Sequence, residues 1–474
     1  MDDWHPFSES VSIGKRIEFG ATGALSSYEI APFFNLDWAS GGVITAIGWT
    51  GNWGSSIAYN ENQELHWNAG MRNIHLKLHP GETIRTPRIM QLYWLGSDEL
   101  RSYNLFRRTM LNHIVPKING ETIVPPIVHM GTSFYELNSS SEENVLSHVE
   151  SIKGLGFEYF WMDAYWMRGD VDHEAGPSFP NGIGNYGFPI ERVPSSGFPR
   201  GLKPIGDRVH KDNMGFVVWF GPEIVYPNTY LAREHPEWVI SPTANGSGTF
   251  NLGIPEAREY MTRYMNTVIK EYGIDCWRTD SGPQLVHWEF NDAQIGPDRG
   301  GITEIRHVEG YYQMWDDMRK ANPHLFIDDC CGGSQRIDLE TMSRAIPLWR
   351  TDGTIAPLFA NDFNQAAMLN QIMTAGLNRY VPFSTSGMMG ATPYWFRSGV
   401  NGGGISFAED VRSLDYNRDA ARKGMKEYNS APQDRTEEYP RDLLKKGIAE
   451  AKRIRKYYFG NYYPLTPASV SPQD

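Results

Sequence analysis

Short runs in which apolar and polar residues alternate predict an antiparallel β domain at the start of the chain. In NIHLKLHPG, Ile74, Leu76 and Leu78 alternate with polar residues, which places three apolar side chains on one face of a strand. The runs GGVITAIGWTG and TPRIMQLYWLG are rich in β-branched and aromatic residues and are bounded by Gly or Pro. We therefore expect residues 1–97 to form a shortened antiparallel β-sandwich domain whose start is incomplete.

One amphipathic segment follows this region. DELRSYNLFRRTMLNHIV places Leu100, Met110 and Ile114 among charged residues, a pattern that is typical of a helix with one apolar face. We expect residues 98–122 to contain a helix that joins the sandwich to the next domain.

Strand-like and helix-like runs alternate from residue 123 onward, as in repeated βα units around a parallel sheet. One predicted helix begins at Pro255 and stops at Gly273, and another begins with a capping box in which Ser140 precedes Glu143 by three residues. The strand-like runs, in order, are PPIVHMG, YFWMDAYW, MGFVVWFGPE, CWRTDSG, LFIDDCCGG, PLWRTDG, NRYVPFST and ISFAED. Eight strands predict a (β/α)8 TIM barrel, of class α/β, over residues 123–474.

Four of these runs end in a carboxylate. Asp163, Glu223, Asp280 and Asp352 each follow several apolar residues. Any one of them, taken alone, could simply cap the next helix. Because the carboxyl ends of the strands line the active site of a (β/α)8 barrel, all four together indicate a convergent polar site.

Charge and composition exclude several classes of function. The formal net charge is −12 and the sequence pI is about 5.6, so nucleic acid and anionic membrane surfaces are not expected as partners. Apolar runs such as FVVWF are far shorter than the roughly 20 residues of a membrane span. The acidic N-terminus lacks the basic and apolar regions of a secretory signal, so we predict a cytoplasmic location, and an extracellular or periplasmic one if an upstream segment has been removed.

Cysteine and histidine usage predicts no metal site and no cofactor. The chain has 3 Cys and 13 His but no HExxH motif and no CxxC with paired His. Two of the cysteines are the neighbours Cys330 and Cys331, so a disulfide framework is not expected and the thiols should be reduced. Cys330 has no cysteine-protease signature around it, and we expect it to contact a ligand or to pack.

Hydrolysis of a sugar acetal needs one ionised carboxyl group and one protonated carboxyl group. Asp280 and Asp352 are the natural pair, and each follows an arginine by two residues, Arg278 and Arg350. Since side chains alternate along a strand, we expect each arginine to point to the same side as its acid and to lower that acid's pKa.

Aromatic residues flank the same strand ends and could stack on the apolar faces of sugars. We expect Trp166 and Trp219 to lie in the site, whereas Trp277 is off the inward-facing set and should pack against a helix.

Several linked strings resemble the melibiase family of α-galactosidases, glycoside hydrolase family 36. GLKPIGDRVHKDNMGFVVWFGPEIVYPNTYLAREHPEWVI is similar to the family's stretch from the third strand to its HP-x-W segment, and NLGIPEAREYMTRYMNTVIKEYGIDCWRTD resembles the helix and strand that deliver its nucleophile. IDDCCGGSQRID resembles the family's ESCSGGGGRFD segment, and LWRTD stands where the family has Trp-x-Ser-Asp. The resemblance covers roughly residues 40–465.

The resemblance implies a retaining double-displacement mechanism with Asp280 as nucleophile and Asp352 as general acid/base. It also implies a set of residues that contact the sugar. These are Asp163, Trp166, Trp219, Arg278, Cys330, Gly332 and Gly333 around the terminal sugar, and Trp49 and Trp53 reaching over the pocket from the β domain. Arg350 joins the substrate-binding candidates from the strand alternation alone.

The chain departs from the family pattern at the sugar-binding motifs. Ala164 and Tyr165 replace the second Asp and the Gly of Asp-Asp-Gly-Trp, Arg278 replaces a Lys, and Gly221 replaces the first Glu of WFEPE. Losing an acceptor that a sugar hydroxyl expects costs about 1–3 kcal/mol, enough to change which sugar is preferred. The identity of the sugar therefore stays open.

We expect a hydrolase of terminal α-linked sugars, foremost α-galactosides, whose partner is a glycoside. A related α-glycosidase or transglycosidase and a non-catalytic carbohydrate-binding homologue are alternatives, as is a metal-assisted hydrolase with Asp163, Glu223 and Asp280 as oxygen ligands. An abbreviated β domain leaves open edges or apolar surface, so we also expect a homo-oligomer.

Overall fold

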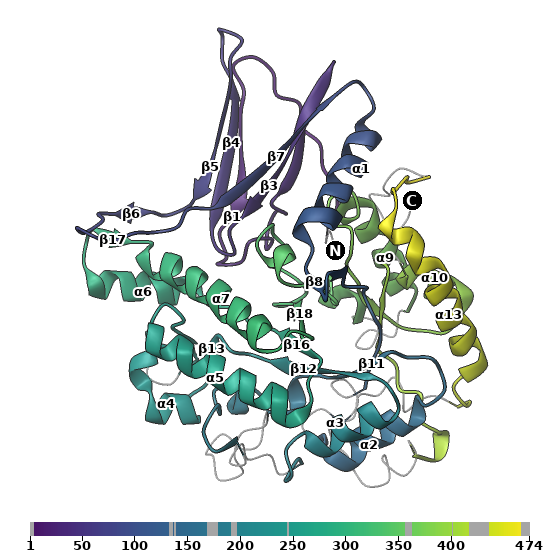
Figure 1. Cartoon of the computed structure of the whole chain (residues 1–474). Helices are drawn as coiled ribbons and strands as arrows, with labels where there is room; N and C mark the ends of the chain where they lie inside the picture. Colours follow the sequence, from purple (N-terminus) through teal and green to yellow (C-terminus); the bar gives the residue numbers. More distant parts are fainter. Residues whose placement is uncertain are drawn as a thin grey trace.

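Two three-stranded antiparallel sheets form the N-terminal domain (Figure 1). One sheet has the order β1-β4-β5 and the other β2-β3-β7; their bounds are β1 Arg16–Ala21, β4 Trp53–Tyr59, β5 Leu65–Met71, β2 Phe33–Trp38, β3 Gly41–Gly48 and β7 Arg88–Leu95. Phe34 of β2 packs against Phe19, Trp53 and Trp67 of the other sheet, with ring centroids 4.8–6.5 Å apart. The two sheets thus share an aromatic core, and the predicted β-sandwich is confirmed.

The structure, a computed structural model, describes residues 4–131, 136, 139–167, 179–190, 197–243, 246–355, 363–400, 402–416 and 436–465. Within this part, the predicted strand around residue 75 is the short β6 (His75–Leu76), which pairs with β17 (Arg299–Gly300) of the barrel. Helix α1 (Glu99–Thr109) begins after Asp98, whose side chain accepts the Arg101 N–H, and continues as a π-helical turn over Met110–Ile114.

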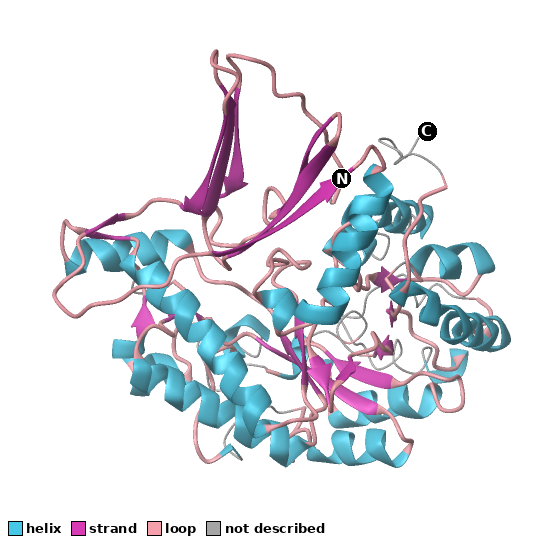
Figure 2. Ribbon diagram, turned by 45° about the horizontal axis from the view of Figure 1, so that its top comes forward, coloured by secondary structure: helices cyan, strands magenta, loops and turns pink. Residues whose placement is uncertain are grey.

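A sheet of seven parallel strands forms the centre of the second domain. In sheet order these are β18 (Phe326–Asp329), β16 (Cys276–Thr279), β12 (Gly215–Phe220), β11 (Tyr159–Met162), β10 (Ile127–Met130), β20 (Ile405–Phe407) and β19 (Gly387–Met388). Figure 2 shows the helices around the outside of these strands. They include α2 (Glu142–Ser151), α3 (Lys203–Lys211), α5 (Pro255–Tyr272), α6 (Leu285–Ile295), α7 (Ile302–Ala321), α9 (Phe363–Leu377), α10 (Pro393–Gly399) and α13 (Arg441–Ile454). The sandwich followed by a TIM-like barrel is the predicted fold.

Two of the eight predicted strands, in PLWRTDG and NRYVPFST, are not strands. The main chain there still bridges the gap between β18 and β19, since Ile346 N–H donates to Ile327 O and Arg350 N–H to Thr385 O. However, Leu348 N–H donates to the Asp328 side chain instead of to a neighbouring strand. A proline at 347 has no N–H to contribute, so these segments cannot form a continuous ladder.

One predicted helix has the expected start and stop residues, and another starts one residue later than predicted. Helix α5 begins with Pro255 and ends at Gly273, whose φ of 67° is the left-handed conformation that glycine adopts at no steric cost. Helix α2 is capped by Ser141, whose side chain accepts the Asn144 N–H, so the predicted capping box at Ser140 is one residue early. In the part of the chain that the structure describes, no helix has the length and apolarity needed to cross a bilayer.

Apolar side chains remain exposed on the β domain. Ile89, Tyr93 and Leu95 of β7 are 41%, 70% and 80% exposed. This is the apolar surface that a shortened sandwich was expected to leave, and the oligomeric state stays a prediction.

Candidate active site

Asp280 follows β16 at its carboxyl end and is held by three donors. Its Oδ1 accepts the N–H groups of Ser281 at 2.7 Å and Gly332 at 2.8 Å, and its Oδ2 accepts Trp219 Nε1 at 3.2 Å. Its own N–H donates to Phe220 O on the neighbouring strand. Three donors thus fix the orientation of the carboxyl group, and the side chain keeps 21% of its surface exposed.

Arg278 lies at the centre of a group of carboxylates. Its Nη1 is 2.5 Å from Asp328. Its Nε is 3.6 Å from Asp163, and its Nη2 is 3.6 Å from Asp280. Its guanidinium lies 4.2 Å from the ring centroid of Trp161. Burial opposes its charge, but the acidic groups around it raise its pKa well above the ordinary value. Arg278 therefore points to the same side as Asp280, as predicted, and stays charged.

Asp352 begins a 3₁₀ turn over Asp352–Ile355 and is exposed. Its Oδ1 accepts the indole N–H of Trp349 at 2.8 Å. The Trp349 ring packs edge-on against Trp161 at 5.7 Å, and Trp161 is the ring on which Arg278 lies. A chain of aromatic contacts thus connects the two predicted acids.

One loop touches both acids. Gly332 N–H donates to Asp280, and a Cβ on Gly333 would come within 2.8 Å of Asp352 N. Gly332 and Gly333 have φ values of 61° and 90°, a conformation that favours glycine. The structure therefore brings the Asp280 side chain and the backbone of Asp352 to a single turn, at the carboxyl ends of the strands.

Cys330 precedes this turn and is fully buried. Its sulfur accepts Gly333 N–H at 3.4 Å. Burial, together with the nearby carboxylates, raises the pKa of its thiol well above the ordinary value. A protonated thiol is a poor nucleophile, so Cys330 supports the turn.

Of the remaining predicted residues, Asp163 lies beside Arg278 and Trp219 beside Asp280. Asp163 accepts Trp161 Nε1 at 2.8 Å and Ala164 N–H at 2.8 Å. Trp166 donates its indole N–H to Trp219 O at 2.9 Å, so the two predicted aromatic residues are neighbours.

Trp277 faces away from the site, as predicted. Its ring stacks on Phe220 and packs edge-on against Trp315 of helix α7 at 6.2 Å.

The prediction that Arg350 lies beside Asp352 is wrong. Arg350 is fully buried, donates to Ser386 Oγ at 3.4 Å, and lies near Tyr458 and Tyr462 instead of beside Asp352. Burial lowers its pKa to about 10. The prediction assumed strand alternation between residues 350 and 352, but this segment is irregular and Asp352 starts a turn.

Trp49 and Trp53 also differ from the expectation. Both are fully buried. Trp49 donates to Glu304 Oε1 of the barrel at 3.0 Å, whereas Trp53 lies in the sandwich core and donates to Ser26 O at 2.6 Å. Neither ring has exposed surface with which to cover a pocket. Asp328, which the sequence analysis missed, does lie at the site; the only signal was a charged residue inside an apolar run, LFIDD.

Glu223 does not join Asp163 and Asp280. It accepts Arg336 Nη1 at 2.6 Å and pairs with His307 Nε2 at 2.9 Å. The metal-assisted alternative therefore loses one of its three ligands, and no group of three or more metal-ligating side chains occurs among the described residues.

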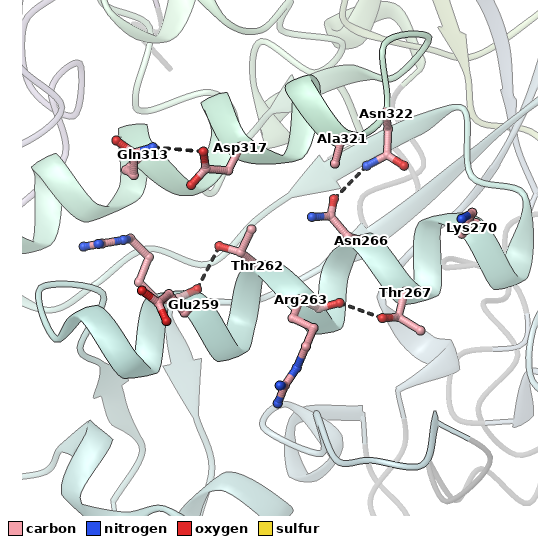
Figure 3. A pocket seen from close by; sticks show the side chains of 11 residues that line it. Glu259, Thr262, Arg263, Asn266, Thr267, Lys270, Gln313, Asp317, Ala321 and Asn322 are labelled. Carbon is pink, nitrogen blue, oxygen red and sulfur yellow. Dashed lines mark hydrogen bonds between the residues drawn. The ribbon is translucent and has the colours of Figure 1, made fainter.

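A large open groove lies elsewhere, between helices α5 and α7 on the outside of the barrel (Figure 3). Its volume is about 610 Å³, and its lining residues, which include Arg263, Lys270 and Asp317, are polar and mostly solvated. It shares no residue with the site at the strand ends.

Comparison with known proteins finds a matching family and several relatives. The family model described as Melibiase matches residues 86–362, more than half of the chain. Alpha-galactosidase Mel36A from Lactobacillus acidophilus is 23% identical over 364 residues, which are 73% of this chain and 47% of that protein. An alpha-galactosidase from Escherichia coli is 25% identical over 285 residues, 59% of this chain and 37% of that protein.

The fold has solved relatives as well. A variant of the GH36 alpha-galactosidase AgaA from Geobacillus stearothermophilus, in a crystal structure with stachyose, gives a TM-score of 0.74 at 18% identity and covers 96% of this chain and 60% of that one. The chain spans less than half the length of the curated relatives it matches. These findings confirm the resemblance carried by the strand-end motifs: the chain belongs to the melibiase family, glycoside hydrolase family 36.

Proposed function

We propose that the chain hydrolyses terminal α-linked sugars, foremost α-galactosides, with retention of configuration. The observation that supports this proposal is the Gly332–Gly333 turn, which contacts the Asp280 side chain and the backbone of Asp352, with Arg278 beside Asp280. The two carboxyl groups differ in environment as a nucleophile and an acid/base should. Several relatives are named as alpha-galactosidases, which supports the choice of sugar.

In the first step, an Asp280 carboxylate oxygen attacks the anomeric carbon. A bond forms between this oxygen and the carbon while the glycosidic C–O bond breaks, and Asp352 gives its proton to the departing oxygen. In the second step, Asp352 takes a proton from water, the water oxygen bonds to the anomeric carbon, and the ester to Asp280 is released. Two inversions give net retention.

The neighbours of each acid suit these roles. Three donors fix the orientation of the Asp280 carboxyl group, and the Arg278 guanidinium lies 3.6 Å from it. Asp352 is exposed, so it can exchange protons with solvent between the two steps.

Preference for galactose is the finer part of the proposal. Trp219, which donates to the nucleophile, its neighbour Trp166, and Asp163 beside Arg278 are proposed to bind the terminal sugar. However, Ala164 stands where the family has an acceptor. Another α-glycoside, or transfer to an acceptor sugar in place of water, therefore remains a second candidate. A cytoplasmic location stays a prediction.

Azide rescue with aryl α-galactosides tests the assignment of roles. Asp280→Gly and Asp352→Gly should both lose activity on the order of 10⁴-fold, and azide should restore turnover in each. Rescue of Asp280→Gly should give the β-galactosyl azide, because one inversion remains. Rescue of Asp352→Gly should give the α-azide, because azide attacks the covalent intermediate.

The exposed Asp316, which pairs with Arg344, offers a matched control, since Asp316→Asn removes a surface carboxylate on helix α7. This variant should keep full activity. Activity of Asp280→Gly without azide would refute the nucleophile. If the purified chain is silent on a panel of aryl glycosides while sugars still raise its melting temperature, the non-catalytic binding alternative is correct.

A further inference from the structure

Asp328 is a buried carboxylate that the two-acid mechanism does not use. It lies on β18, fully buried, in register with Arg278 on the neighbouring strand β16. Its Oδ2 is 2.5 Å from Arg278 Nη1, and its Oδ1 accepts Leu348 N–H at 2.7 Å. One carboxylate thus holds a side chain with one oxygen and a main-chain segment with the other.

The first oxygen sets the position of the Arg278 guanidinium. With Nη1 on Asp328, the other two nitrogens lie 3.6 Å from Asp163 and from Asp280. The contact with Asp328 is the shortest of the three, and so it keeps the guanidinium from forming a close ion pair with Asp280. The cation can then lie beside the nucleophile without forming a tight ion pair that would hold back its attack.

The second oxygen sets the position of the segment that leads to Asp352. Leu348 N–H would bond to a neighbouring strand in a regular barrel, but here it bonds to Asp328. Leu348 O accepts the hydroxyl of Ser406. The next residue, Trp349, gives its indole N–H to Asp352. Displacing Leu348 would therefore displace the indole that orients the acid/base.

We propose that Asp328 is a positioning residue that couples the two acids, holding Arg278 away from a closed pair with Asp280 and holding the Leu348–Trp349 segment under Asp352. The inference rests on the proposed function, because it takes Asp280 and Asp352 as the reacting acids. A purely structural role, in which Asp328 only neutralises a buried cation, makes different predictions.

Three variants distinguish the roles of the two carboxylate oxygens of Asp328. In Asp328→Asn the amide oxygen can still accept Leu348 N–H, but the NH₂ group faces Arg278 and releases the guanidinium toward Asp280. In Asp328→Ala both bonds are lost. Asp328→Glu keeps the charge and tests rescue, and Asp316→Asn is the matched surface control.

The first readout is the acidic limb of the kcat/KM profile, which reports ionisation of the nucleophile. In Asp328→Asn this limb should move to lower pH, and kcat should fall on the order of 10²-fold because a more acidic carboxylate attacks more weakly. Arg278→Gln should move the same limb to higher pH. A structural role would leave the limb in place in Asp328→Asn.

The second readout is the ratio of kcat/KM for an activated substrate, 4-nitrophenyl α-galactoside, to that for a poor leaving group, methyl α-galactoside. Asp328→Ala should raise this ratio about 10-fold over Asp328→Asn, because only the poor leaving group needs a well-placed acid. An equal ratio in both variants would overturn the link to Asp352. Asp328→Glu should restore part of the lost kcat, and no recovery would also count against the proposal.

Both readouts are independent of how much of the variant is folded, since a pH limb and a ratio of substrates do not depend on the concentration of active protein. The azide experiment separates the two levels of inference. If Asp280→Gly and Asp352→Gly behave as proposed while the limb and the ratio stay unchanged in the Asp328 variants, only the role of Asp328 falls. If Asp280→Gly is active without azide, the proposed function itself is wrong.

Discussion

Glu304 joins the two domains through a buried carboxyl group whose ionisation should be measurable as a loss of stability. It lies in helix α7, 3% exposed, and accepts Trp49 Nε1 at 3.0 Å, Asn52 N–H at 2.7 Å and Asn52 Nδ2 at 2.7 Å. Burial raises its pKa from 4.5 to about 7, against the effect of these donors, and Asp292 adds to the rise.

The sign and size of the effect follow from linkage between protonation and folding. Because the folded state holds the proton more tightly than the unfolded state, the stabilisation is complete below pH 4.5 and is lost as the pH rises through about 7. The full difference in pKa, about 2.5, corresponds to about 3 kcal/mol. Between pH 5.5 and 8 the two titration curves predict a loss of about 2 kcal/mol in the free energy of unfolding.

The variant Glu304→Gln removes this titration and keeps an acceptor for Asn52. We would measure the free energy of unfolding in urea, by tryptophan fluorescence, for both proteins at several pH values from 5.5 to 8. The difference between the original protein and the variant should shrink by about 2 kcal/mol across this range, since all other groups titrate equally in both. Glu259→Gln, at an exposed position of α5, is the control and should show a constant difference. A constant difference for Glu304→Gln as well would refute the reasoning.

Three other predictions concern single features. Arg412→Met leaves the buried carboxylates of Asp410 and Glu136 without their cation, so the free energy of unfolding in urea should fall by about 3–5 kcal/mol, and a loss below 1 kcal/mol would contradict the packing. Gly333→Ala forces a Cβ to 2.8 Å from Asp352 N at a φ of 90°, so kcat should fall on the order of 10²-fold with the fold retained by circular dichroism; unchanged kcat would show that the turn is not fixed. The exposed apolar side chains of β7 should give a homo-oligomer in light scattering at micromolar concentration, and a monomer would refute self-association.

Local sequence patterns were sufficient to predict the elements whose apolar residues keep one regular spacing. The apolar spacing between Pro255 and Gly273 predicts helix α5 to the residue, because Pro favours the first helical turn and Gly the left-handed stop. The same reasoning was less accurate for residues 347–352 and 378–385, where β-like composition does not produce strands. There the N–H of Leu348 has a side-chain partner, which no sequence period reveals.

Periodicity and turn residues act over a few neighbours, so they were enough to predict the kinds of element, the sandwich and barrel, and the carboxylates where strands end. The partners of the charged side chains depend on how these elements pack in three dimensions. Arg278 and Arg350 occupy matching places in CWRTD and LWRTD, yet one lies among three carboxylates and the other is buried beside tyrosines. Contacts between residues far apart in the chain, such as Trp49 with Glu304, arise when strands and domains close, because burial then demands a partner for every polar group.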